Sequence, residues 1–232
     1  MTDLAQKRAN GAFVKSLADN SSGSSLATRM RRARFALFLS LLRKVKRPVR
    51  VLDIGGTQAF WNLMGEGEDL DADITLLNLN HQPVTSSAFT SATGDARSIP
   101  QYADKSFDVV FSNSVIEHVG SYGDQRRMAA EVMRVGKRYF VQTPNKRFPL
   151  EPHFLFPYFQ YLPMGIRAQM LHRFDVGWYK RVPSLERARA EVESIQLLTK
   201  GKFAALFPDA TIYEEKLLGL TKSFVAYGGW EA

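Results

Sequence analysis

The chain has 232 residues, of which 45% are hydrophobic and 23% are charged. This length and composition suffice to bury an ample core within one domain. The sequence contains no cysteine, which excludes disulfides, thiolate catalysis and cysteine-bound zinc. The four histidines, His81, His118, His153 and His172, lack the short helical spacing of a typical zinc pair, so we expect no metal site.

The formal net charge of +8 is concentrated in one segment. No acidic residue stands between Asn20 and Leu52, whereas nine bases do: Arg29, Arg31, Arg32, Arg34, Arg43, Lys44, Lys46, Arg47 and Arg50. Removing these nine from the 31 Lys and Arg leaves 22 bases against 23 acids. The rest of the chain is therefore nearly neutral, which argues against a chain-wide nucleic-acid surface.

Residues 1–48 are expected to form a flexible segment followed by a basic amphipathic helix. Residues 20–25 are polar, Thr28 could cap a helix, and Pro48 closes the segment. Apolar residues recur between them at helical spacing: Phe35, Phe38, Leu39, Leu42 and Val45. We interpret this helix as packed on the sheet edge with its bases in water. The alternative is weak contact of residues 29–47 with an anionic membrane or an anionic substrate.

Nothing in the sequence indicates export or membrane insertion. Residues 1–20 carry scattered charges and no apolar core typical of a signal peptide. No stretch is long and apolar enough to span a bilayer. We therefore expect a cytoplasmic protein.

The most informative segment is Val49-Arg-Val-Leu-Asp-Ile-Gly-Gly56. An apolar run bounded by glycine is typical of a buried strand that enters a tight turn. Glycine lets the backbone approach a ligand where a Cβ would clash. Asp53 comes at the end of this strand, which is where open α/β sheets bind their ligands.

Four further segments follow in order: Ile74–Asn78, Thr93–Arg97, Ser106–His118 and Arg138–Asn145. Together with the first, they resemble the class I S-adenosylmethionine-dependent methyltransferases. The Val-Ile-Glu-His sequence after the expected fourth strand is similar to the small-molecule, methyltransferase type 11-like branch. The resemblance covers about residues 49–145 and is looser from there to the C-terminus.

This resemblance implies an α/β fold with a Rossmann-like, doubly wound, seven-stranded sheet. The sheet would be mostly parallel, with a C-terminal antiparallel hairpin formed by residues 210–214 and 223–227. Residues 200–207 would form a short helix that Thr199 caps. We expect a single methyltransferase domain over residues 49–232, with residues 1–48 as a helical extension.

The resemblance also implies an S-adenosylmethionine site. Gly55 and Gly56 would turn around the amino-acid end of the cofactor, and Asp53 would interact with its ammonium group. The remaining positions implied by the resemblance would contact the ribose (Asn78, Asn80), the adenine (Asp95, Ala96) or other parts of the cofactor (Thr57, Ser112, Asn113, Val115). For each position, the alternative is a purely structural turn or loop residue.

Two positions depart from the family pattern. Thr57 stands where a glycine is usual and adds a hydroxyl group to the loop. Asn78 stands where an acid normally holds both ribose hydroxyls. An amide can still accept one hydroxyl, but it lacks the charge-assisted bond, so cofactor binding would be weaker than is typical.

His118 is the candidate general base, because its pKa lies naturally near neutrality and it follows the fourth strand closely. Glu117 could hold the imidazole ring or face elsewhere. The alternative is that methyl transfer proceeds by proximity and alignment without a strong base.

Residues 144–183 are the expected acceptor-side cover. They hold six of the ten prolines and many aromatic residues, so neither a long strand nor a long helix can run through them. Such a cover suits a partly apolar acceptor or the exclusion of water, and the alternative is a structural plug over the sheet. His153 and His172 are secondary base candidates within it.

The favoured function is O-methylation of a small molecule or a glycan-type metabolite, with that acceptor as the main partner. One alternative is a non-catalytic S-adenosylmethionine-binding protein, which Thr57 and Asn78 would suggest. RNA methylation is weaker, because the proline-aromatic tetrapeptide of amine-methylating enzymes is replaced by Ser112-Asn-Ser-Val115. A nicotinamide-dependent oxidoreductase would need Gly-x-Gly-x-x-Gly, but no glycine follows Gly56 until Gly65.

Overall fold

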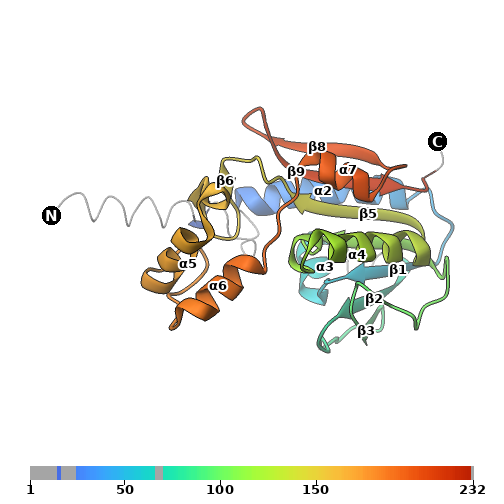
Figure 1. Ribbon diagram of the computed structural model, residues 1–232. Helices are drawn as coiled ribbons and strands as arrows, with labels where there is room; N and C mark the ends of the chain where they lie inside the picture. The colour runs from blue at the N-terminus through green and yellow to red at the C-terminus, as the bar shows by residue number, and fades with distance from the viewer. Residues whose placement is uncertain (1–14, 17–24, 66–69, 231–232) are drawn as a thin grey trace. The chain divides into compact units, whose positions relative to one another are not determined.

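The computed structural model describes residues 15–16, 25–65 and 70–230 (Figure 1). Seven strands form one sheet in the order β3-β2-β1-β4-β5-β9-β8. The first five strands along this order are parallel, and β9 is antiparallel to both β5 and β8. The strands are β1 (Val49–Ile54), β2 (Ala72–Asn78), β3 (Phe89–Thr93), β4 (Phe107–Asn113), β5 (Gly136–Pro144), β8 (Thr211–Leu217) and β9 (Leu220–Gly228). The predicted fold class is confirmed.

The helices are α2 (Leu26–Leu42), α3 (Gln58–Met64), α4 (Tyr122–Val135), α5 (Met164–Arg173), α6 (Leu185–Glu193) and α7 (Lys200–Leu206). Two short 3-10 helices, η1 (Ile116–His118) and η2 (Phe159–Tyr161), and a two-stranded ribbon of β6 (Leu150–Glu151) and β7 (Phe156–Pro157) complete the elements. Across the described ranges, no helix has both the length and the apolar character that a bilayer crossing requires.

The chain divides into two compact units. The sheet unit comprises residues from Phe38 to Phe148 and from Ser194 onward. The helical unit comprises the described residues up to Leu37 together with Pro149–Glu193. All seven strands of the main sheet, and every residue predicted to bind the cofactor, belong to the sheet unit.

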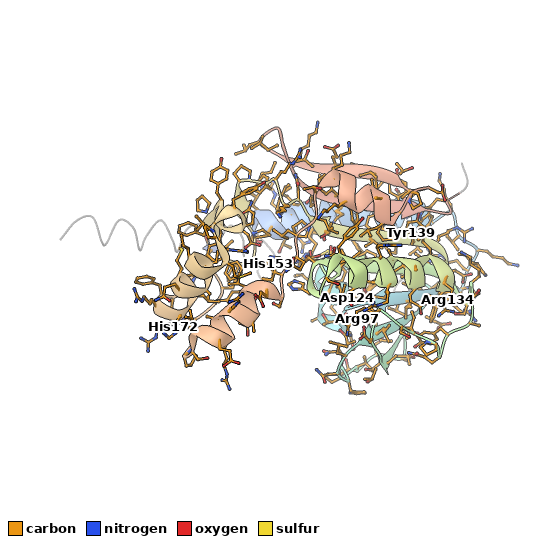
Figure 2. All side chains as sticks on the ribbon, in the orientation of Figure 1. Arg97, Asp124, Arg134, Tyr139, His153 and His172 are labelled. Carbon is orange, nitrogen blue, oxygen red and sulfur yellow. The ribbon has the colours of Figure 1, made fainter. Side chains whose placement is uncertain are left out.

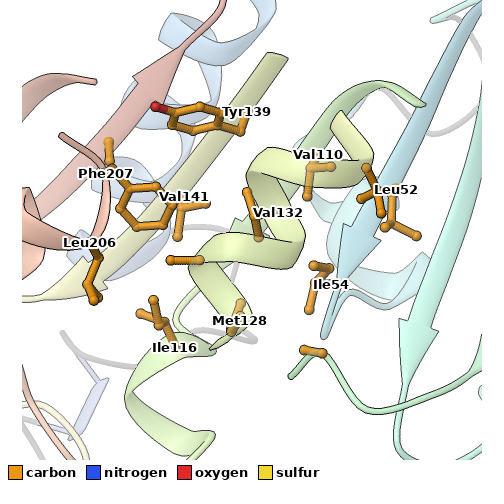
Figure 3. Close-up of a cluster of buried hydrophobic side chains, with 14 of the residues drawn as sticks. Leu52, Ile54, Val110, Ile116, Met128, Val132, Tyr139, Val141, Leu206 and Phe207 are labelled. Atoms are coloured by element: carbon orange, nitrogen blue, oxygen red, sulfur yellow. The ribbon is translucent and has the colours of Figure 1, made fainter. Parts of the chain in front are cut away.

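One face of the sheet packs against α4 and α7 (Figure 3). Leu52 and Ile54 of β1 and Val110 of β4 meet Met128 and Val132 of α4 in this core. These side chains alternate with their neighbours along each strand, because successive residues of a strand point to opposite faces. This core therefore fixes which residues of β1 and β4 face the other side.

The opposite face is aromatic. Phe38 of α2 lies with its ring centroid 4.7 Å from that of Phe111 and 6.2 Å from that of Trp61 of α3. Phe111 of β4 stacks on Phe140 of β5 at 5.8 Å. Because successive side chains of a strand point to opposite faces, Asp53 lies on the same face as Val51, two residues earlier. Val51 is fully buried, and the turn after β1 follows Asp53. An ionisable group thus lies among aromatic rings.

Several local predictions need correction. The helix α2 packs on a face of the sheet, over Phe111 of β4 and Phe140 of β5, and not on the sheet edge. Thr199 precedes α7 as its N-cap residue, but its side chain makes no capping hydrogen bond. The side chain that caps α2 is Ser25, whose Oγ accepts a hydrogen bond from the Thr28 backbone at 3.0 Å, whereas Thr28 is buried inside the helix. The C-terminal strands are longer than predicted, and only Leu218 and Gly219 separate them. Both residues have positive φ, which is the geometry of a two-residue hairpin turn.

In the helical unit, short β and 3-10 pieces occupy Pro149–Pro163, and the ten-residue helix α5 follows within the predicted cover of residues 144–183. The carboxylate of Glu151 is buried and accepts hydrogen bonds from the backbone of His153 at 2.8 Å and of Phe154 at 2.6 Å. Gly177 passes so close to Phe154 that an added Cβ would lie 2.2 Å from its backbone. These contacts hold the irregular backbone in one arrangement.

Candidate cofactor site

The turn after β1 has room for glycine alone at two successive positions. Gly55 has a φ of +76°, and an added Cβ would lie 2.4 Å from Cγ2 of Val115. A Cβ on Gly56 would lie 1.7 Å from Oδ2 of Asp53. The Gly55 N–H also donates to the Leu77 carbonyl at 2.8 Å. The turn is thereby packed against Val115 and Asp53, and Gly55 is exposed at the carboxyl edge of the sheet.

Asp53 lies directly beneath this turn. Its side chain is buried, and Trp61 Nε1 donates a hydrogen bond to Oδ2 at 2.8 Å. Burial raises the pKa of Asp53 to about 8, and the hydrogen bond from Trp61 opposes that rise. The carboxyl group is therefore protonated at neutral pH as long as no cation joins it.

Thr57 is the N-cap of α3. It has extended backbone geometry, and its Oγ1 accepts a hydrogen bond from the Phe60 backbone at 3.3 Å. Threonine at this position satisfies one of the free N–H groups at the start of a helix. The hydroxyl that departs from the family pattern therefore has a structural role, and its contact with the cofactor stays a prediction.

Asn78 ends β2 and ties that strand to the glycine turn. Its Nδ2 donates to the Gly56 carbonyl at 2.9 Å. An aspartate could not make this bond, because an ionised carboxylate only accepts. The amide oxygen of Asn78 is the atom that could accept a ribose hydroxyl. Asn80 is exposed two residues further on, and its carbonyl accepts a bond from Gln82 Nε2 at 3.4 Å.

Leu79 is a candidate site residue that the sequence analysis missed. It lies between Asn78 and Asn80 at the carboxyl end of β2, and 71% of its surface is exposed. An apolar side chain this exposed at a ligand-binding edge could cover the flat face of a base. The signal in the sequence was a leucine between two polar residues directly after a strand.

Asp95 follows β3 and is held by Arg97. Its two carboxylate oxygens accept from Arg97 Nε and Nη2 at 2.9 and 2.6 Å, and Oδ1 also accepts from the Arg97 backbone. These bonds hold the pKa of Asp95 below its usual range. Arg97 also reaches Asp124 of α4 at 3.4 Å (Figure 2). The Asp95 carboxylate is only partly covered, so an adenine amine could still reach it.

Two hydrogen bonds place the other predicted residues around the same edge. The Gly94 N–H donates to the Asn78 carbonyl at 2.9 Å, which brings Asp95 and the largely buried Ala96 beside the end of β2. Ser112 is fully buried, and its Oγ donates to the Ile54 carbonyl at 3.2 Å. This bond joins the ends of β4 and β1, so the hydroxyl supports the edge instead of facing a ligand. Asn113 follows as the last residue of β4.

His118 ends the 3-10 turn η1, which follows β4, and it is exposed. Its backbone N–H donates to the Val115 carbonyl at 2.8 Å, so the histidine is fixed to the residue that covers Gly55. The neighbouring Glu117 is fully buried instead, and its Oε2 accepts from Thr143 Oγ1 at 2.9 Å. The two side chains of the Glu-His pair thus have different environments.

The two secondary base candidates belong to the helical unit (Figure 2). His153 Nδ1 lies 2.7 Å from Glu151 Oε1, in a pair whose carboxylate is buried. His172 Nδ1 lies 3.0 Å from the Val182 carbonyl, which ties α5 to the segment after it. Both rings therefore stabilise the helical unit, and a role for either in catalysis stays a prediction.

Comparison with known proteins agrees with this geometry. Residues 45–139 match the family model of a methyltransferase domain. The uncharacterized protein Rv1509 of Mycobacterium tuberculosis is 37% identical over 73 residues, which are 32% of this chain and 25% of that protein. The chain thus spans about a quarter of the length of this curated relative.

Two solved structures show the same fold. The PH0226 protein of Pyrococcus horikoshii is 16% identical, with 89% of this chain and 92% of that chain covered and a TM-score of 0.51. A candidate sarcosine dimethylglycine methyltransferase of Galdieria sulphuraria is also 16% identical, with 80% and 63% covered and a TM-score of 0.50. At this identity the likeness concerns the fold alone.

The domain match and the fold define the class. The chain contains a methyltransferase domain of the class I, S-adenosylmethionine-dependent family, and the cofactor of this family is S-adenosylmethionine. The predictions of family and cofactor are confirmed.

Proposed function

We propose that this protein transfers a methyl group from S-adenosylmethionine to an oxygen of a small molecule or a sugar-containing metabolite. The observation that carries the proposal is the Gly55–Gly56 turn. It is closed against Val115 and bonded to Asn78, and both of its glycines lie where a Cβ would clash. A backbone turn of this kind can lie directly against a ligand at the carboxyl edge of the sheet.

The groups around this turn fit the parts of the cofactor. Gly55, Gly56 and Asp53 would hold the amino-acid end, and the Asn78 amide oxygen would accept a ribose hydroxyl. Leu79 and Ala96 would cover the adenine, and the partly exposed Asp95 would accept from its amine. Each contact is of a type that these side chains can make.

The departures from the family pattern do not favour the non-catalytic alternative. Thr57 caps α3, and Asn78 donates to the turn. Both residues stabilise the structure that would hold the cofactor. The exposed His118 follows that structure in the sequence and offers a base that catalysis could use.

When bound, S-adenosylmethionine supplies a methyl group on a positively charged sulfur, and a nucleophile that attacks the methyl carbon displaces the sulfur as the leaving group. His118 would accept the proton of an acceptor hydroxyl as the oxygen attacks, because a neutral imidazole is a suitable base near pH 7. Its fixed backbone would hold the ring near the methyl group, which adds the benefit of alignment.

The acceptor can be found with labelled S-adenosylmethionine. The protein is incubated with this donor and with fractionated extract of the host, and the labelled product is identified by mass spectrometry. We expect label in a small molecule, at an oxygen. Label found only in RNA or in protein would overturn the proposal.

A further inference from the structure

Among the described residues, neither the hydrogen-bond partner of the Asp53 side chain nor its neighbours on the flanking strands carry a positive charge. The hydrogen-bond partner is the neutral indole of Trp61, which is itself fully buried. The flanking strands place Leu76 of β2 and Phe111 of β4 beside it. Residues 38–42 of α2 and the whole of α3 contain no ionisable side chain, and the base of α2 that is nearest in sequence before Phe38 is the buried Arg34.

The charged residues of the same strands lie at the other end of the sheet. Arg50 donates its backbone N–H to Asp108, which pairs with Lys137 at 2.7 Å. Asp73 of β2 is paired in register with Arg50, three residues before Asp53 along β1. None of these groups contributes to the ionisation of Asp53, for which burial and the Trp61 bond are the causes.

The ligand proposed for this site brings the missing cation. We propose that binding of the amino-acid end of the cofactor is coupled to the release of one proton from Asp53 to solvent, and that Trp61 is the positioning residue that sets this coupling. The inference rests on the proposed function. The O–H bond of the carboxyl group breaks, the proton goes to water, and the resulting carboxylate pairs with the ammonium of the ligand.

The role of Trp61 follows from hydrogen-bond chemistry. The indole N–H can only donate, so its bond to Oδ2 is stronger when Asp53 is ionised. It therefore lowers the cost of ionising a carboxyl group that burial keeps neutral. It also holds Oδ2 directly under Gly56, in the space that a Cβ of that residue would occupy.

The coupling can be measured by titration calorimetry with S-adenosylhomocysteine, which has the same ammonium group and is not consumed. For the wild type, affinity is expected to rise about tenfold between pH 6 and pH 7, because the free site is protonated in this range. Titrations in buffers of different ionisation enthalpy are expected to show nearly one proton released per ligand. The matched variant Asp53→Asn has no carboxyl group to ionise at this position. Only the ionisation of the ligand itself can then change the affinity, so the affinity of this variant is expected to be the same at pH 6 and pH 7.

Trp61→Phe separates positioning from packing. Without the indole donor the carboxylate forms less readily, so affinity at pH 7 is expected to fall and then to recover toward the wild-type value above pH 9. A packing defect would lower affinity equally at every pH. Phe38→Leu disturbs the same aromatic cluster but leaves the indole donor of Trp61 in place, so it is expected to keep the wild-type pH profile.

Three results would overturn the inference: equal wild-type affinity at pH 6 and pH 7, binding without proton release, or a Trp61→Phe loss that high pH does not restore. If S-adenosylhomocysteine binds at no pH, it is the proposed function that fails. A Trp61→Phe variant that does not fold is recognised by its lack of cooperative unfolding, and the comparison of wild type with Asp53→Asn then decides.

Discussion

Asn78 shows how one amide group shapes the cofactor edge. From sequence, replacing it with the usual acid would be expected to tighten ribose binding through a charge-assisted bond. The structure reverses this expectation, because Nδ2 donates to the Gly56 carbonyl. An aspartate would lose the donor and place a negative oxygen against that carbonyl.

We therefore predict that Asn78→Asp weakens cofactor binding by about 1–3 kcal/mol, the cost of leaving a polar group without its partner. Calorimetric titration with S-adenosylhomocysteine measures the change, and Asn80→Asp makes the same replacement at the other predicted ribose position for comparison. Tighter binding by Asn78→Asp would show that the ribose contact outweighs the bond to the turn.

His118 is the residue whose replacement tests catalysis directly. If it accepts the acceptor's proton, His118→Ala should lower kcat by roughly a hundredfold with little change in cofactor affinity. His118→Gln, which keeps a polar side chain but cannot serve as a base, should be equally slow. Near-normal turnover in either variant would leave alignment alone to explain the rate.

Single-residue roles were only partly predictable from sequence. The positions of Asp53, Gly55 and Gly56 follow from one apolar run and its ending. The burial of Asp53 against Trp61 does not follow from that run. It depends on how α3 folds back over β1 and on which face of the sheet the Asp53 side chain points to. The same holds for Arg97, whose pairing with Asp95 depends on the turn after β3.

At the level of elements, α3 is the helix on which the site depends most. It has only seven residues, begins at the Thr57 cap and carries Trp61. Short helices gain little from their own hydrogen bonds, so caps and packing hold them in place. Thr57→Ala is predicted to lower the free energy of unfolding by about 1 kcal/mol, and Thr57→Ser should restore most of it. Urea denaturation gives both values, and equal stability of Thr57→Ala and wild type would contradict the capping role.

The strands were predictable because each is a short apolar run that ends in polar residues. Their lengths at the C-terminus were not, because the run Leu217-Leu-Gly-Leu220 contains a glycine and lacks the alternation of polar and apolar residues that is typical of a strand. Pairing across the hairpin, with a turn of only Leu218 and Gly219, extends both strands. Local pattern thus predicts where a strand exists, while its partner determines where it ends.

For the whole molecule, Asp53 has a consequence for stability. The folded protein holds its proton up to about pH 8, whereas an unfolded chain releases it near its ordinary pKa of 3.8. Since the folded state binds more protons in this window, the free energy of unfolding falls as pH rises from about 4 to 8, by several kcal/mol in total.

Asp53→Asn should remove this part of the pH dependence. The paired carboxylates Asp108 and Glu131 have lowered pKa values, and their stabilisation is present above the ordinary range and lost in acid. Urea denaturation of wild type and Asp53→Asn at pH 5, 6.5 and 8 isolates the contribution of Asp53. A constant difference between the two proteins across these pH values would contradict a buried, neutral Asp53.

The central claim is that the glycine turn of the sheet unit binds S-adenosylmethionine, and one calorimetric comparison tests it most directly. S-adenosylmethionine and NAD are titrated at pH 8 into wild type, Gly55→Ala and the control Gly201→Ala, where an added Cβ meets open space. We predict one S-adenosylmethionine per chain for wild type and Gly201→Ala, no detectable binding by Gly55→Ala, and no binding of NAD. Binding of NAD instead, or equal affinity of Gly55→Ala and wild type for S-adenosylmethionine, would contradict the account.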